Sequence, residues 1–169
     1  AGMGKGSSTV GVSGAGNYRG GDVVMIDQLN DPALVTSSGE GGVCTWCGRD
    51  DGARAMDEVV LVTSISGNSS TFHRSLYYNY ESKFQPQLSV TSRTPVRNAG
   101  IEDLYIGAAS GTTESGGVVM TYSVYSWVKN IESYNIPYKH IEISWGGYGN
   151  EVRDCYLHET TRYDGDHGY

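Results

Sequence analysis

The sequence predicts an all-β protein in which residues 98–169 form stacked coils of a right-handed parallel β-helix. Two observations lead to this fold class. Gly accounts for 24 of the 169 residues and Tyr for 13, and no segment sustains an apolar pattern with the 3.6-residue period of a helix. A β-strand pattern also recurs in the last third of the chain, at a spacing typical of solenoids.

The recurring pattern consists of three segments that align without gaps. They begin at residues 101, 128 and 152, so they are 27 and then 24 residues apart, and they read IEDLYI, VKNIES and VRDCYL. A second strand, predicted at 118–121 and again at 140–144, follows the first two segments. One long and one short strand per turn, with no helical pattern between them, favours a β-helix over a leucine-rich horseshoe.

The third column of this alignment predicts a bend. Positions one, four and six carry mainly apolar residues, so the spacing changes from two residues to three at position three. Asp103, Asn130 and Asp154 occupy that position. Asp and Asn tolerate left-handed backbone and can bond nearby amides, which suits a corner between two strands. We therefore expect these three residues to have a structural role.

The first half of the chain shows a different organisation. Residues 1–19 are rich in Gly and are assigned to an early β-helix coil or turn, and residues 20–97 to an insertion. Within the insertion, residues 21–26 predict a strand, and residues 59–65 and 70–72 predict a β-hairpin around a Ser-Gly-Asn turn. The boundaries expected from the sequence are therefore 1–19, 20–97 and 98–169.

The charge balance limits the partners of this protein. Twelve Lys and Arg against 19 Asp and Glu give a net charge of −7, and no basic stripe is present. Nucleic acid is therefore not expected as a partner, because binding to it depends on neutralised phosphates. No run of 18 apolar residues occurs, so no membrane span is expected. The opening residues do not resemble a signal peptide. The expected explanation is that the sequence is a mature or excised fragment.

The three cysteines fall into two groups. Cys44 and Cys47 form a Cys-x-x-Cys motif between Gly-rich flanks, whereas Cys155 lies in an apolar alternation and is expected to be a small buried residue. A local disulfide that closes the 44–47 loop is the favoured interpretation. Free thiols are the alternative, and a metal or redox role lacks the usual second pair or helix start.

The repeat segments resemble the pectin-lyase-like superfamily of right-handed parallel β-helices. The resemblance is carried by residues 100–106 (GIEDLYI), 126–133 (SWVKNIES) and 150–158 (NEVRDCYLH), and more loosely by residues 1–4 and 21–26. It covers about residues 98–169. Known members include polysaccharide lyases, glycoside hydrolases, epimerases, esterases, phage tailspikes and adhesins, and they generally have more coils. The resemblance implies a secreted, extracellular or cell-surface protein that binds polysaccharide.

Two columns on the outer face contain residues that could cleave polysaccharide. Position two reads Glu102, Lys129 and Arg153, an acid and two cations on neighbouring coils. A lyase needs a base and cations that stabilise an enolate, so Lys129 and Arg153 are catalytic candidates, together with Glu132. A surface ladder that avoids like charges is the alternative. Asp103 and Asp154 are two coils apart, a spacing relevant to inverting hydrolases, but a corner role is favoured.

Other outward residues are candidates for binding carbohydrate. Tyr105 and Tyr156 share a column with Glu132 and could stack against sugars. His140 and Glu142 are placed together on an outward strand face, for which simple solvation is the alternative. His158 belongs to the polar C-terminal cluster.

The same cluster suggests a metal. Asp164 and Asp166 could bind Ca²⁺ through carboxylate oxygens, although Asp-Gly-Asp is also an ordinary turn. No cofactor is otherwise expected. The pattern shows few coils and no cap, so end-to-end self-association is a further expectation. The sequence favours a polysaccharide-degrading β-helix over the alternative, a non-catalytic structural or adhesive β-helix.

Overall fold

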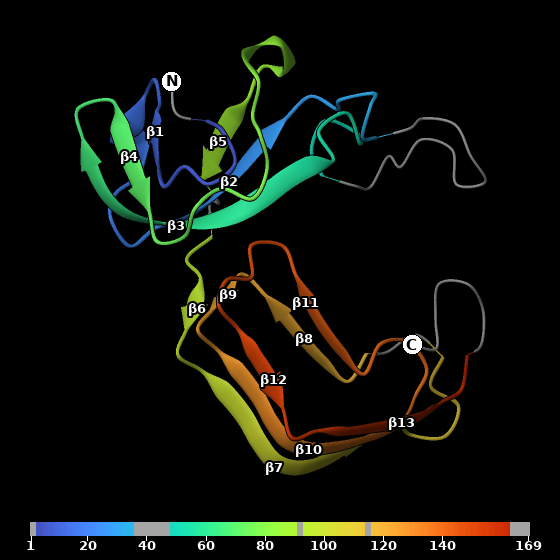
Figure 1. The fold of residues 1–169 in the computed structure, drawn as a ribbon. Coiled ribbons are helices and arrows are strands. Elements are labelled where there is room, and N and C mark those ends of the chain that lie inside the picture. Colours follow the sequence, from blue (N-terminus) through green and yellow to red (C-terminus); the bar gives the residue numbers. More distant parts are fainter. Residues whose placement is uncertain (1–2, 36–47, 91–92, 114–115, 163–169) are drawn as a thin grey trace. The chain divides into compact units, whose positions relative to one another are not determined.

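A computed structural model describes residues 3–35, 48–90, 93–113 and 116–162 (Figure 1). Its contacts divide the chain into two units, residues 1–92 and 93–169, which are described separately below. Strands dominate both units, and the only helices in the described ranges are two short 3₁₀ turns, η1 (Ala15–Asn17) and η2 (Ser82–Phe84). No helix among these residues is long and apolar enough to cross a membrane. The all-β class expected from the sequence is confirmed.

Unit 1 is built on one antiparallel sheet with the strand order β1-β4-β3-β2-β5. The strands are β1 (Thr9–Gly11), β2 (Val23–Gln28), β3 (Met56–Ser66), β4 (Ser69–Phe72) and β5 (Gln87–Val90). The predicted hairpin is confirmed by the pairing of β3 with β4, and the strand predicted at 21–26 corresponds to β2. The assignment of residues 1–19 to a coil differs from what is found, because β1 pairs antiparallel with β4 in this sheet.

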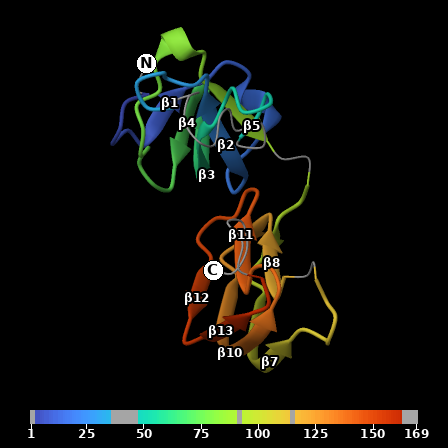
Figure 2. The ribbon, with the colours of Figure 1, turned by 90° about the vertical axis from the view of Figure 1, so that its right-hand side faces the viewer.

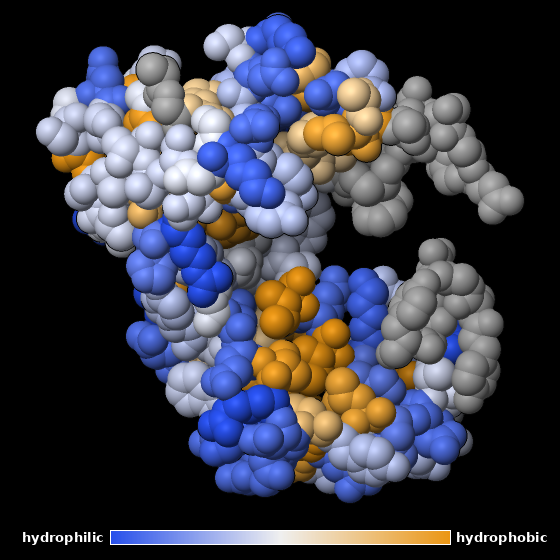
Figure 3. All heavy atoms as spheres, viewed as in Figure 1, coloured by the Kyte–Doolittle hydropathy of each residue, from blue (hydrophilic) through white to orange (hydrophobic). Residues whose placement is uncertain are grey.

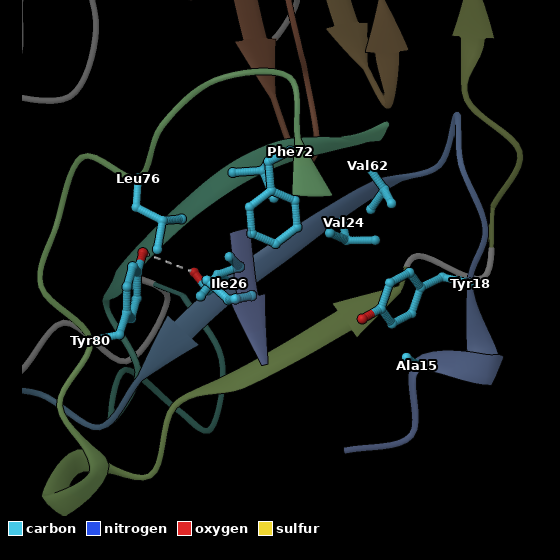
Figure 4. Close-up of a cluster of buried hydrophobic side chains, with 10 residues drawn as sticks. Ala15, Tyr18, Val24, Ile26, Val62, Phe72, Leu76 and Tyr80 are labelled. Carbon is cyan, nitrogen blue, oxygen red and sulfur yellow. Dashed lines mark hydrogen bonds between the residues drawn. The ribbon is translucent and has the colours of Figure 1, made fainter. Parts of the chain in front are cut away.

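The core of unit 1 is formed by side chains from one face of the sheet together with those of its loops. Val24, Ile26, Val62 and Phe72 are buried on the strands, and loop residues pack against them (Figure 4). The Tyr80 hydroxyl reaches the carbonyl of Ile26 at 3.4 Å, so this loop tyrosine keeps a polar contact inside an apolar cluster. Burial is the main cause that raises the pKa of Tyr80 far above its ordinary value.

A second set of buried residues in unit 1 is charged. Asp27 on β2 is fully buried and accepts hydrogen bonds from Arg54 Nη1 at 2.9 Å and from Arg49 Nη2 at 3.0 Å. Arg54 also donates to Asp50 at 2.8 Å. A buried carboxylate is tolerated only when such partners compensate for its lost hydration. This network therefore fixes the segment 48–55 against the sheet.

Unit 2 has a β-helix-like arrangement of parallel strands. They are β6 (Val96–Arg97), β7 (Gly100–Gly107), β8 (Val118–Thr121), β9 (Ser123–Val124), β10 (Trp127–Ile136), β11 (Ile141–Ser144), β12 (Glu151–Arg153) and β13 (Tyr156–Thr160). All the strand pairs described in this unit are parallel: β10 with β7, β12 and β13, β8 with β11, and β6 with β9. Figures 1 and 2 show the strands of successive coils lying side by side.

The register of unit 2 agrees with the sequence alignment residue by residue. Val128 on β10 lies opposite Ile101 on β7 and opposite Val152 on β12. The shorter strands behave in the same way, since Ile141 on β11 lies opposite Val118 on β8. The two-residue strands β6 and β9 form a third parallel pair, which the sequence did not predict.

The corner of each coil lies at position three of the repeat. Asp103, Asn130 and Asp154 have φ values of 59°, 48° and 54°, in the left-handed region that most residues avoid. Asn130 Nδ2 also donates to Asp103 Oδ1 at 2.7 Å, which links two coils along this column. One left-handed residue in each of the three coils therefore bends the long strands at the same position, and a side-chain bond joins two of these residues.

The interior columns of unit 2 are covered unevenly. Val128 and Ile131 on the middle strand are buried, because they have a neighbouring coil on both sides. Ile101 and Val152, in the column of Val128, and Leu104, in the column of Ile131, are 40–42 % exposed, and so is Leu157, which lies opposite the buried Ser133. Figure 3 shows apolar residues gathered in the space between β12 and β11. The first and last described coils thus leave interior side chains partly open.

Candidate functional site

The outer face of the sheet formed by β7, β10 and β13 carries a cluster of polar and aromatic side chains. After the bend at Asn130, residues of β10 alternate, so Ile131 and Ser133 are buried while Glu132 and Tyr134 face outward. The register places Tyr105 and Tyr156 beside Glu132, and His158 beside Tyr134. We call these five residues the tyrosine–histidine patch: Tyr105, Glu132, Tyr134, Tyr156 and His158.

Close ring contacts hold the tyrosine–histidine patch together. The His158 ring stacks on Tyr156 with centroids 4.0 Å apart and an interplanar angle of 14°, and it lies 5.1 Å from the Tyr134 ring. His158 Nε2 is 3.0 Å from Glu132 Oε1. Tyr105 and Tyr156 remain 59 % and 64 % exposed. The patch therefore combines exposed ring faces with a carboxylate and an imidazole whose positions are fixed by neighbouring strands.

A glycine makes room for one of these rings. Gly107 lies opposite Tyr134 in the register, and a Cβ atom at Gly107 would come within 2.9 Å of the Tyr105 hydroxyl oxygen. That approach is closer than side chains tolerate, so the lack of a side chain at Gly107 lets the Tyr105 ring lie over its own strand.

The charged residues of the position-two column all take part in ion pairs. Lys129 Nζ is 4.0 Å from Glu102 Oε2, Arg153 Nε is 3.1 Å from Glu151 Oε1, and Arg153 Nη1 is 2.8 Å from Asp154 Oδ2. Both proposed catalytic cations therefore have carboxylate partners, and all these groups are partly exposed. The register places Lys129 beside Arg153, so these carboxylates compensate two like charges on neighbouring strands.

The expected outward pairing of His140 with Glu142 is wrong. His140 is buried, and its Nδ1 is 2.8 Å from the Oγ atom of the buried Ser133. Burial is the largest cause that lowers the pKa of His140. Glu142 does face outward, with its Oε2 atom 3.4 Å from Lys139 Nζ. The strand alternation applies only from Ile141, where β11 begins, so it could not place the corner residue before it.

The remaining sequence-based candidates are the cysteines and the proposed metal ligands. Cys44, Cys47, Asp164 and Asp166 fall within the ranges that the structure does not describe. Cys155 is a free, partly buried thiol whose Sγ points to the carbonyl of Arg153 at 3.1 Å. Within the described ranges, no group of three or more His, Cys, Asp or Glu side chains could hold a metal ion.

Two side-chain features of unit 2 also went beyond the sequence-based candidates. Tyr134 was not among the candidate residues, although its position two residues after Glu132 on a strand would have placed it on the same face. The second is the close packing of Trp127 on Gly100, where a Cβ atom would come within 2.0 Å of the indole ring. Trp127 therefore packs against a neighbouring coil and does not stand free.

Comparisons with known proteins identify no family for this chain. No family model matches it, and no curated protein matches it. Among solved structures, it is similar to the Gp54 tailspike of the Acinetobacter baumannii phage AP22, which was solved in complex with a capsular saccharide. The TM-score is 0.48 at 14 % identity, over 93 % of this chain and 32 % of the tailspike.

Two further solved structures are similar at a comparable level. The gp49 tailspike of Pseudomonas phage LKA1 gives a TM-score of 0.44 at 15 % identity, over 90 % of this chain and 31 % of that one. The gp61 tailspike of Pseudomonas phage phi297 gives 0.44 at 14 % identity, over 94 % and 32 %. The chain thus spans about a third of the length of the tailspikes it matches.

Proposed function

We propose that this protein is a β-helix-like scaffold that binds polysaccharide through the tyrosine–histidine patch. The observation that carries the proposal is the geometry around His158, which stacks on Tyr156 and bonds to Glu132, while Tyr105 and Tyr156 on either side of Glu132 remain more than half exposed. This combination of aromatic faces with fixed polar groups suits a ligand that is apolar on its ring faces and polar at its rim.

A saccharide has that chemistry. The C–H face of a pyranose ring can lie on a tyrosine, and its hydroxyls can donate to Glu132 or bond to the tyrosine hydroxyls. Tyr105, Glu132 and Tyr156 belong to three adjacent strands, spaced at roughly 4.8 Å. That spacing lets consecutive strands contact neighbouring parts of one extended glycan. Because the groups project from paired strands, little ordering is needed when the ligand binds.

The same geometry favours binding over cleavage. The patch contains one carboxylate, Glu132, whereas a glycosidase uses two, about 5–9.5 Å apart. The cations proposed for a lyase, Lys129 and Arg153, are engaged with Glu102 and with Glu151 and Asp154. The non-catalytic structural or adhesive function, which the sequence analysis held as its alternative, is therefore the one we put first.

We propose that the coils wind right-handed, as in the pectin-lyase-like superfamily, and that the protein acts outside cells, where polysaccharide coats are found. The partly exposed columns at both ends of the described coils favour end-to-end pairing of copies. Sedimentation velocity over a concentration series tests the pairing, and a mass that does not change with concentration would exclude it.

The binding proposal is tested with a panel of neutral and acidic polysaccharides. The full chain is titrated by calorimetry, in parallel with Tyr156→Ala, Tyr105→Ala and the control Tyr77→Ala, a unit 1 tyrosine that is also 64 % exposed. We expect one class of polysaccharide to bind and the two patch variants to lose about tenfold or more in affinity. Equal loss in Tyr77→Ala, or no binding by any polysaccharide, would overturn the proposal.

Cleavage is followed in the same samples. Ultraviolet absorbance reports the unsaturated ends that a lyase releases, and a reducing-end assay reports hydrolysis. We expect neither signal. Turnover that disappears in Lys129→Ala or Arg153→Ala, with folding intact by circular dichroism, would instead establish the degrading function.

A further inference from the structure

The sheet of unit 1 ends in two strands that run in the same direction. In the order β1-β4-β3-β2-β5, each of the four neighbouring pairs is antiparallel, so β1 and β5 are parallel to each other. Within the part of the chain that the structure describes, each of these two strands has a strand neighbour on one side only. A single additional strand of the opposite direction would therefore be antiparallel to both.

The two edge strands also line one cavity. It has a volume of about 360 Å³ and is open to solvent, and Val10 and Gly11 of β1 and Gln87 and Leu88 of β5 contribute to its wall. Ile26, Leu76 and Tyr80 of the core line the same space. The sheet thus curls far enough around its core to bring both edges to a common opening, of a size that suits a bound ligand.

The backbone groups at this opening follow from the strand ladders. Phe72 N donates to Ser8 O and Val12 N donates to Asn68 O, so the even-numbered residues of this segment face β4. The alternation of an antiparallel ladder then directs the backbone N–H and C=O of Gly11 to the free edge. The bond from Val62 N to Asp22 O shows that the even-numbered residues of β2 face β3, so its odd-numbered residues face β5. The β5 residues opposite them, Gln87 and Ser89, face β2. The backbone N–H and C=O of Leu88 therefore face the free edge of β5.

We infer that this slot binds an extended peptide segment, which adds a sixth strand between β1 and β5. A strand edge is a template for peptide backbone, because it offers donors and acceptors at the spacing of another strand. The occupant should carry apolar residues at alternate positions, since Val10, Ile26 and Leu88 form the inner wall. Its remaining side chains face solvent and should be polar. This inference is independent of the polysaccharide proposal, which concerns unit 2.

The test uses a fluorescein-labelled peptide of alternating valine and threonine with a lysine at each end. Fluorescence polarisation with the full chain should show saturable binding. The matched control is the same peptide with every valine and threonine amide N-methylated, which keeps the side chains and removes the N–H donors toward both edge strands. We expect the methylated peptide to bind at least about tenfold more weakly. Equal binding of both peptides, or no saturable binding, would overturn the inference.

Two further measurements locate the peptide. Gly11→Pro removes the N–H that faces the slot, so it should weaken binding of the unmethylated peptide by about tenfold while circular dichroism remains unchanged. The second measurement is hydrogen exchange on the unaltered chain, so its result does not depend on whether Gly11→Pro folds. The amides of Gly11 and Leu88 should become protected when the peptide is added. Binding without protection of either amide would show that the peptide lies elsewhere and would reject the slot.

Discussion

His158 Nε2 lies 3.0 Å from Glu132 Oε1 and thereby connects two adjacent parallel strands on the outer face of unit 2. The bond also holds the imidazole in place between the rings of Tyr156 and Tyr134. The contact joins groups that are partly exposed, and such pairs contribute little to stability. Its main consequence is therefore the arrangement of the tyrosine–histidine patch.

That arrangement predicts different outcomes for binding and for stability in Glu132→Ala. We expect polysaccharide affinity to fall about tenfold, because the carboxylate and the orientation of His158 are lost together. The free energy of unfolding should change by less than about 1 kcal/mol. Calorimetric titration and urea unfolding measure the two quantities. Glu102→Ala is the matched control, since Glu102 is similarly exposed on the same sheet but pairs with Lys129 before the bend. Unchanged affinity in Glu132→Ala would contradict the prediction.

The corner column gives a prediction about backbone conformation. Asn130 combines a φ of 48° with the bond to Asp103, so Asn130→Ala should cost about 1–2 kcal/mol of unfolding free energy. Asn130→Gly loses the same side-chain bond but accepts the left-handed backbone, and it should cost less. Urea denaturation of both variants measures the difference. If Gly proved as costly as Ala, the side-chain bond and not the backbone would dominate at this corner.

The repeat columns and the corner could be predicted because each follows from a local spacing. Alternation of apolar residues places Val128 and Ile131 inside, and the change of spacing at Asn130 marks the turn. His140 could not be placed in this way, because it precedes β11 at a corner where alternation does not apply. The strands β6 and β9 contain two residues each, too few for a pattern.

Contacts between residues far apart in the chain could not be predicted from the sequence either. Arg49 and Arg54 lie 22 and 27 residues after Asp27, and nothing in this spacing indicates that the tertiary fold brings them together. The patch was predicted in part, since the column of Tyr105, Glu132 and Tyr156 follows from the alignment. The stacking of His158 on Tyr156 depends on side-chain conformation, which the sequence does not specify.

The buried histidine predicts a pH dependence. The pKa of His140 is lowered in the folded state, chiefly by burial, while the nearby positive charge that His158 can carry acts in the same direction and a backbone bond to Glu159 opposes it. Protonation therefore favours the unfolded chain. The stability that neutral His140 contributes is present above its unfolded pKa of about 6.5 and is lost as the pH falls below it. Urea unfolding between pH 8 and about pH 5 measures this loss. His140→Gln should show a smaller decrease, and an identical decrease would assign it to other groups.

The buried carboxylate in unit 1 gives the largest expected effect on stability. Arg54→Ala removes the Arg54 Nη1 bond to the fully buried Asp27, leaving Arg49 as its remaining cation. Breaking a buried pair costs about 3–5 kcal/mol, and the bond that Arg49 keeps places the expected value at about 3 kcal/mol. Arg19→Ala is the control, because Arg19 is 90 % exposed and lies 4.0 Å from Asp22. It should cost less than about 0.5 kcal/mol. Equal costs in the two variants, measured by urea denaturation, would show that the buried network does not stabilise unit 1.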